Sequence, residues 1–323
     1  MRMAEIGKIE LSRRNGPQMN RSAISVCLIA MWLLPCGTMG KEVKRPRILG
    51  IQSVSFYSSN PQRARPFYAL LSGSSGECEG CPTPAFSYFP LISGQSIQIK
   101  PVDKQMGASF FSVITFETDD VIRMKNYLNS QHVDLEEVRS DGALKVIRLA
   151  DPEGHRIAFA HSSPLMVPRS NKVPNSVPSK RLIHAGFVVK DRAAMDHFYK
   201  DILGFRLYWS GGMKEGETNW VAMQVPDGTD WVEYMLNVPD NADKHTLGVM
   251  NHISLGVVSV KAAKEQLEKA GVVLGAEEQP KIGRDGKWQL NLYDPDGTRV
   301  ELMEFTPVEK PCCSEFTGPH PKP

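Results

Sequence analysis

Two stretches decide the fold: RLIHAGFVV at residues 181–189 and NHISLGVV at residues 251–258. Each alternates as a strand does, with apolar residues on one face and a histidine followed by small residues on the other. His184 and His252 stand 68 residues apart, and so do Glu233 and Glu301. The equal spacing predicts one small unit used twice, with each copy sending a histidine and a glutamate to a shared point.

Each unit is expected to begin with a strand and continue into a helix. One helix is expected over about residues 192–203 with Asp191 as its N-cap, and the other over about residues 260–270 with Ser259 as its N-cap. Further strand patterns occupy residues 205–209, 219–224, 231–236, 287–293 and 299–305. The predicted fold class is therefore α+β, built from paired βαβββ units.

The opening strand shows how the faces are expected to divide. Ile183, Ala185 and Phe187 share the face that can lie under the following helix, whereas His184 shares the opposite face with Gly186. The small residues beside the histidine are expected to leave room for a cavity.

Four side chains are therefore expected on the concave side of one curved sheet: His184, Glu233, His252 and Glu301. Imidazole nitrogens and carboxylate oxygens hold Zn, Ni, Co, Mn or Fe(II) while leaving positions open for chemistry. A buried carboxylate without a partner is costly, and a metal ion removes that cost. We therefore predict one divalent metal site in this part of the chain.

The same fold is expected earlier in the chain. Residues 47–163 end in the turn Asp151-Pro152-Glu153-Gly154, and residues 181–306 end in the related turn Asp294-Pro295-Asp296-Gly297, with a proline-rich linker at 164–180 between the two blocks. Alignment on the shared motifs places the following residues at or near the four ligand positions of the first block: Ser53, Gln98, Val113 and Ala158. The first block is therefore predicted to be free of metal.

The ends of the chain carry different signals. Residues 1–40 contain a short apolar run after a basic residue, which is typical of a signal peptide and predicts export to a bacterial periplasm or secretion. Cys36 leaves a lipoprotein open, with a membrane anchor in that case alone, and Arg13-Arg14 leaves a twin-arginine signal open. The proline-containing tail at 307–323 is predicted to be poorly ordered.

Composition narrows the class of partner. The chain has 323 residues, a formal net charge of +2 and no basic block, which argues against nucleic acid as a partner. Cys78 and Cys81 form a C-x-x-C without a second such pair, so a disulfide or a free thiol is favoured over a zinc ribbon. A homodimer is left open.

Residues 181–306 resemble a domain of the vicinal oxygen chelate superfamily, also known as the glyoxalase, fosfomycin-resistance and dioxygenase family. The resemblance rests on Ile183-His184-Ala185-Gly186, Phe198–Phe205, Val232-Glu233-Tyr234, Asn251–Ser254 and Asp294–Leu302. It implies two tandem domains of paired βαβββ modules, with His184, Glu233, His252 and Glu301 as metal ligands in the second.

The resemblance implies an enzyme that acts on a small molecule with vicinal oxygens. Our main expectation is a lyase or isomerase of glyoxalase or epimerase type, in which Glu233 or Glu301 removes a proton beside a metal-bound oxygen. One alternative is an Fe(II) extradiol-type ring-cleaving dioxygenase that uses His184, His252 and Glu301 as a facial triad. Another is a non-catalytic protein that binds a small molecule, with Trp209, Trp220, Trp231 and Trp288 available to line its pocket.

Overall fold

The computed structural model describes residues 43–77, 85–102, 111–140, 143–161 and 177–323. The expected targeting segment at 1–40, most of the linker at 164–180 and the Cys78-x-x-Cys81 motif lie outside these residues. In the described part of the chain no helix is long and apolar enough to cross a membrane.

The first domain is built on a seven-stranded mixed sheet with the strand order β2-β3-β1-β4-β7-β6-β5. Its elements are β1 (Ile48–Ser58), α1 (Pro61–Ser72), β2 (Ser87–Pro90), β3 (Ser96–Pro101), β4 (Phe111–Thr118), α2 (Val121–Ser130), β5 (Glu136–Ser140), β6 (Ala143–Ala150) and β7 (Arg156–Ala160).

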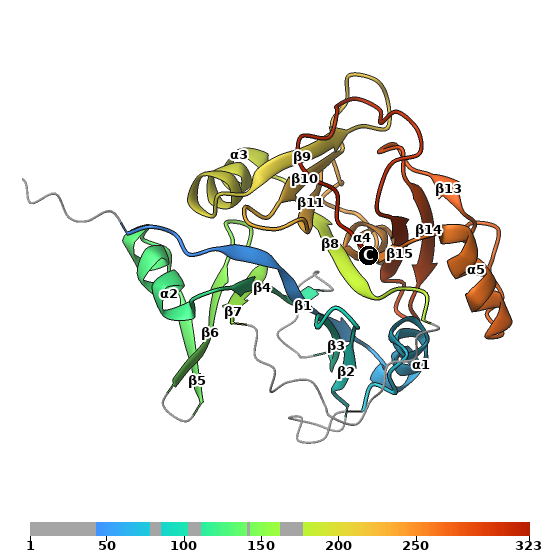
Figure 1. Ribbon diagram of the computed structural model, residues 1–323, viewed down its shortest axis with the longest axis horizontal. Coiled ribbons are helices and arrows are strands. Elements are labelled where there is room, and N and C mark those ends of the chain that lie inside the picture. Colours follow the sequence, from blue (N-terminus) through green and yellow to red (C-terminus); the bar gives the residue numbers. More distant parts are fainter. Residues whose placement is uncertain (1–42, 78–84, 103–110, 141–142, 162–176) are drawn as a thin grey trace, which may run out of the picture. The chain divides into compact units, whose positions relative to one another are not determined.

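The second domain is built on an eight-stranded mixed sheet with the order β13-β14-β15-β12-β8-β11-β10-β9 (Figure 1). Its elements are β8 (Arg181–Val188), α3 (Arg192–Asp196), the π-helix η2 (His197–Ile202), β9 (Arg206–Gly211), β10 (Trp220–Gln224), β11 (Trp231–Met235), α4 (Lys244–Met250), β12 (His252–Val257), α5 (Val260–Lys269), β13 (Lys281–Ile282), β14 (Trp288–Tyr293) and β15 (Arg299–Glu304). The α+β class with two tandem domains is confirmed, and the second domain contains the βαβββ unit twice.

The predicted helix starts are confirmed by their capping bonds. The side chain of Asp191 accepts a hydrogen bond from the backbone of Ala194, and that of Ser259 accepts one from Ala262. The first of these helices changes into π-helical turns after Asp196, with Leu203 N donating to Phe198 O at 3.0 Å. The short helix α4 was not predicted.

The face assignment for Ile183 is wrong. The pairing of β8 with β12 shifts register beside this residue, between Ser254 and Leu255, as a β-bulge does. Leu182 therefore takes the expected place in the main core, and Ile183 packs in a smaller cluster with Trp231 on the other side of the sheet.

The two domains are joined by a reciprocal pair of buried hydrogen bonds. Tyr68 in α1 of the first domain donates to Asp294 in the second at 2.9 Å, and Tyr199 in η2 of the second donates to Asp151 in the first at 3.2 Å. Each aspartate opens the Asp-Pro-x-Gly turn of its own domain. Burial is the main reason that the pKa of both tyrosines is raised well above its ordinary value, so both remain donors.

The C-terminal tail packs against the second domain, so the prediction of poor order at 307–323 is wrong. Thr317 N donates to Tyr208 O in β9, and the side chain of Gln224 in β10 donates to Pro319 O. The tail, red in Figure 1, thus follows the edge strands of the sheet. Cys312 and Cys313 within it are joined by a disulfide.

Candidate metal centre and cavity

The four predicted side chains come from four strands that are neighbours in the sheet, in the order β15, β12, β8 and β11. Nε2 of His184 lies 3.0 Å from Nε2 of His252 and 3.6 Å from Oε2 of Glu301. Oε2 of Glu233 lies 3.4 Å from Nε2 of His252 and 3.9 Å from Nε2 of His184. The structure therefore brings all four predicted residues to one point.

Gly186 makes room for the second histidine. A Cβ atom on Gly186 would lie 2.1 Å from Cε1 of His252, which no side chain could tolerate. The sequence indicated that small residues in this strand leave space for a cavity, but at this position the imidazole ring of the neighbouring strand fills the space. Glycine is thus required for the two histidine rings to meet.

Both histidines are held as neutral rings. Burial, together with nearby positive groups including Arg299, lowers the pKa of His184 and of His252 well below the ordinary value. Nδ1 of His252 lies 3.1 Å from the carbonyl oxygen of Met250, which fits donation by that nitrogen and leaves the lone pair on Nε2. Nε2 of His252 is thus suited to bind a cation, and Nε2 of His184 faces it at 3.0 Å.

Burial disfavours the ionised form of both glutamates. Burial is the largest cause that raises the pKa of Glu233 to about 7 and the pKa of Glu301 to about 7, and Arg299 acts in the opposite direction on both. Among the described residues, Oε2 of Glu301 and Nδ1 of His184 are buried without a hydrogen-bond partner. These orphaned atoms show that the protein alone does not satisfy the polar groups that it collects here.

The arrangement fits a divalent metal ion. His184, His252 and Glu301 each offer one ligand atom, and these atoms lie within 4.8 Å of one another. Two ligands at right angles with metal–nitrogen bonds of about 2.1 Å lie about 3 Å apart, which matches the observed Nε2–Nε2 separation. Glu233 stands outside this closest group but within 3.9 Å of both histidines.

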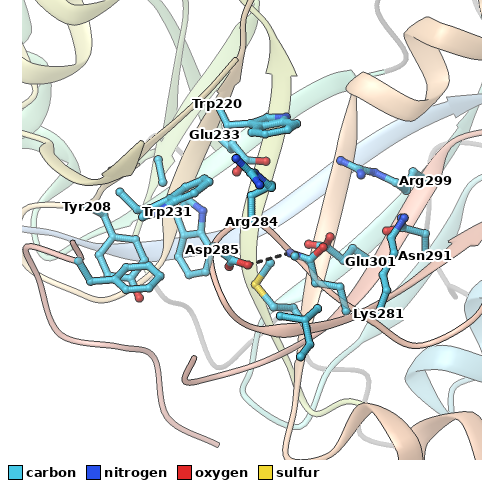
Figure 2. Close-up of a pocket in the computed structure, with 17 residues that line it drawn as sticks. Tyr208, Trp220, Trp231, Glu233, Lys281, Arg284, Asp285, Asn291, Arg299 and Glu301 are labelled. Atoms are coloured by element: carbon cyan, nitrogen blue, oxygen red, sulfur yellow. Dashed lines mark hydrogen bonds between the residues drawn. The ribbon is translucent and has the colours of Figure 1, made fainter. Parts of the chain in front are cut away.

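A cavity of about 310 Å³ opens beside the four residues. Figure 2 shows aromatic side chains on one side, among them Trp220, Trp231 and Tyr208, and Lys281, Arg299 and Asn291 on the other. The first group comes from β9, β10 and β11, and the second from β13, β14 and β15. Phe316 of the tail also contributes to the lining. Of the four tryptophans expected to be available for a pocket, Trp288 does not line this cavity.

We did not predict the polar wall of the cavity from the sequence, although strand alternation indicates two of its residues. Arg299 stands two residues before Glu301 and so shares its face of β15, and Asn291 lies directly opposite Glu301 in β14. The alternation rule that identified the glutamate therefore also places these two side chains.

Lys287 is a buried cation behind the cavity that the sequence did not single out. Its Nζ lies 3.3 Å from the hydroxyl of Tyr208 and 4.8 Å from the ring centroid of Trp231, and the ring of Phe316 lies 4.9 Å away. Burial lowers the pKa of Lys287 to about 8, whereas Asp285 and the two cavity glutamates raise it. No pattern in the local sequence distinguishes this lysine from a surface lysine.

Other ligand-type residues lie away from the centre. Oε1 of Glu304 accepts a hydrogen bond from Val260 N at the start of α5, and His197 pairs with Asp201 on an exposed surface. His245 lies in α4, not in the loop where we expected it. His155 was expected at the surface or in a turn, and it follows the turn at Asp151 with its ring packed on Phe187 of the second domain.

The first domain holds the corresponding positions in the same strand registers. Glu233 pairs with Gly186, which stands two residues after His184 in β8. In the same way Gln98 pairs with Ser55, which stands two residues after Ser53 in β1. The same comparison matches His252 to Val113 and Glu301 to Ala158. The alignment of Ser53, Gln98, Val113 and Ala158 with the four ligand positions is therefore confirmed by the pairing.

Comparison with known proteins agrees with this architecture. Residues 181–302 match the family model described as the Glyoxalase/Bleomycin resistance protein/Dioxygenase superfamily. No curated protein matches the chain in sequence.

Two solved structures illustrate the similarity in fold. The complex of homoprotocatechuate 2,3-dioxygenase from Brevibacterium fuscum with 3,4-dihydroxyphenylacetate has a TM-score of 0.60 at 18% identity, covering 81% of this chain and 82% of that one. The 2,3-dioxygenase LapB from Pseudomonas sp. KL28 has a TM-score of 0.60 at 15% identity, covering 87% of this chain and 96% of that one. The second domain thus matches the model of the glyoxalase/bleomycin resistance protein/dioxygenase superfamily, and the two-domain fold of the chain resembles that of these two dioxygenases.

Proposed function

We propose that this protein is a metal-dependent oxygenase that cleaves the ring of a small catechol-type substrate, with Fe(II) held by His184, His252 and Glu301. The observation that carries the proposal is the buried group of two histidines and one carboxylate beside an open cavity. That ligand set, with positions left free, is typical of non-haem Fe(II) oxygenases. The fold shared with two dioxygenases supports the proposal, because one of those enzymes is seen with a dihydroxy-aromatic acid.

Glu233 is assigned to proton transfer. Its carboxylate reaches the cavity and lies 3.4 Å from Nε2 of His252, and a carboxylate in that place can take up a proton from a bound substrate and return it. When bound, the metal supplies stabilisation of negative charge on the two substrate oxygens. Glu233 then accepts a proton from a substrate hydroxyl, and the aromatic wall orients the ring.

A second candidate follows from the position of the same glutamate. Oε2 of Glu233 lies 3.4 Å from Nε2 of His252, close enough for Glu233 to serve as a fourth ligand after a small shift. A site with two histidines and two glutamates favours the glyoxalase or epimerase type of chemistry, in which a carboxylate removes a proton from carbon.

One experiment separates the two candidates. The full chain is stripped of metal and reloaded with Fe(II) without oxygen, or with Zn(II) or Ni(II), and bound metal is measured. Oxygen uptake with a catechol by the Fe(II) form, with both oxygen atoms entering a ring-opened product, supports the oxygenase. Exchange of a carbon-bound proton of a 2-hydroxy ketone by the Zn(II) or Ni(II) form, without oxygen uptake by the Fe(II) form, supports the second candidate instead.

The variant Glu233→Gln tests the assigned role. If Glu233 accepts a proton and is not a metal ligand, the variant should retain bound Fe(II). Its turnover should fall by about 100-fold or more, because the proton acceptor is lost. Loss of the metal together with turnover would assign Glu233 to the ligands and overturn its role as a free base. Failure of the chain to bind any divalent metal would sink both candidates.

A further inference from the structure

One wall of the cavity is lined by cationic side chains. Arg299 and Lys281, which line it from β15 and β13, form no ion pair with another described residue, and neither does Arg284, which also lines it. Nε of Arg299 has no hydrogen-bond partner among these residues, and neither has Oδ1 of Asn291. The side chain of Asn291 is only 6% exposed, so it belongs to the packed interior and not to the surface.

The side chains around the cavity carry an excess of positive charge. Four cationic side chains gather here, three in the lining and Lys287 directly behind it. Three carboxyl groups oppose them: Glu233, Glu301 and Asp285. A divalent ion on the histidines and Glu301 would increase the positive excess further. A substrate that carries only neutral groups would leave this excess uncompensated inside a partly enclosed space.

The opposite wall has a different character. Trp220, Trp231 and Tyr208 present flat apolar rings to the same cavity (Figure 2). A ligand that satisfies both walls has a flat apolar body and an anionic group at one end. The guanidinium of Arg299 suits a carboxylate in particular, because its fork of N–H donors can bind both oxygens at once.

We propose that Arg299, together with Lys281, forms a subsite for the carboxylate of an aromatic acid and determines the preference of the enzyme for anionic substrates. This proposal rests on the proposed function in that the same cavity receives the substrate. It adds the class of substrate: a small aromatic carboxylic acid whose ring lies toward the tryptophans and whose acid group lies toward β13, β14 and β15.

The test uses two probes that differ in charge but hardly in shape, phenylacetate and phenylacetamide. Binding to the full chain is followed by tryptophan fluorescence, since Trp209, Trp220 and Trp231 line the cavity. The chain is studied free of metal and loaded with Zn(II), so that a carboxylate bound by the metal is distinguished from one bound by the wall. Phenylacetate is expected to bind about tenfold tighter or more in both forms, as charge-assisted bonds to a guanidinium require.

Variants assign the preference to the residue. Arg299→Gln should bring the ratio of the two affinities close to one, whereas Arg299→Lys should retain part of the preference. Lys264→Gln, which removes a cation paired with Glu268 on the exposed face of α5, is the matched control and should leave the ratio unchanged. If Arg299→Gln fails to fold, as thermal unfolding would reveal, Lys281→Gln tests the same wall and should lower the ratio about threefold.

The outcomes separate this inference from the proposed function. Equal binding of the two probes to the wild-type chain, or an equal loss for both in Arg299→Gln, would overturn the carboxylate subsite. Either result leaves metal content and oxygen uptake as an independent test of the oxygenase. Conversely, a charge preference in a chain that takes up no oxygen keeps the subsite and removes the ring-cleaving chemistry.

Discussion

The two sheets offer the same four positions in the same strand registers, yet they fill them in opposite ways. In the second domain the positions carry His184, Glu233, His252 and Glu301, whose polar atoms crowd together with some left unpaired. In the first domain Val113 and Ala158 have no ligand atoms, and Gln98 accepts a hydrogen bond from its neighbour Ser55 at 2.9 Å. The fold therefore does not depend on the four ligand residues, because the first domain forms the same sheet without them.

The first domain supports the second through packing. The main hydrophobic core runs through both domains, and the two tyrosine–aspartate bonds cross between them. Tyr127 of α2 also donates to Ile202 O at the end of η2. The first domain therefore braces the helix that follows β8, the strand that carries His184.

The largest effect is expected from His252→Ala. Removing this ligand should weaken binding of a divalent metal by about 100-fold or more, since one of the three closest ligand atoms is lost. Metal content after dialysis measures the change. The matched control is Val113→Ala at the equivalent position of the first domain, which should leave metal content unchanged. Retention of a full equivalent of metal by His252→Ala would show that metal binding does not depend on the histidine that distinguishes the second domain from the first.

The pH dependence of stability without metal is expected to follow Glu233 and Glu301. Both have a folded pKa raised from the ordinary 4.5 to about 7, so the folded chain binds protons that the unfolded chain has released. The contribution of each carboxyl to the free energy of unfolding should therefore fall as pH rises from about 4.5 to about 7, by on the order of 3 kcal/mol at most. The lowered pKa of His184 and of His252 acts in the opposite direction below about pH 6.5, so the two carboxyls are separated from the histidines by a variant. Urea unfolding across this range measures it.

The double variant Glu233→Gln with Glu301→Gln is the control for this pH effect, because the difference between its pH profile and that of the wild-type chain isolates the contribution of the two carboxyls. Saturating metal should reverse the slope, since the ion binds the ionised carboxylates. A slope that persists unchanged in the double variant would assign the effect to other groups.

The reciprocal tyrosine bonds should prove unequal. Tyr68→Phe leaves Oδ2 of Asp294 without its donor and should cost about 2 kcal/mol in the free energy of unfolding. Tyr199→Phe should cost about 1 kcal/mol, because Oδ2 of Asp151 keeps its contact with His155. Urea unfolding of the metal-free chain compares them, with Tyr234→Phe, which removes a bond to a backbone carbonyl, as the reference. Equal costs would show that His155 does not compensate.

The smallest effect is expected from His197→Ala. This histidine lies on an exposed helical surface, paired with a largely exposed Asp201. The free energy of unfolding should change by less than about 0.5 kcal/mol, and metal content should not change. A loss of metal in this variant would show that a histidine outside the cavity takes part in binding.

The directions of side chains and the starts of helices could be predicted from the sequence. Alternation in β11 and β15 places Glu233 and Glu301 on the cavity face, and the caps at Asp191 and Ser259 act on the next few residues. Such features depend on neighbours in the chain, so a pattern with period two or a capping residue is enough to reveal them. The repeat then predicted that the four positions converge.

The surroundings of these side chains could not be predicted, because they depend on the folded structure. The bulge that turns Ile183 to the other side of β8, the tail that packs on β9, and the burial of Lys287 among aromatic rings each depend on residues far away in the chain. The physical reason is that packing and electrostatic partners are set by contacts across the sheet and between domains, which local periodicity does not encode. The sequence shows that Arg299 shares a strand face with Glu301. Only the folded chain shows that Arg299 lines a cavity and that its Nε has no hydrogen-bond partner among the described residues.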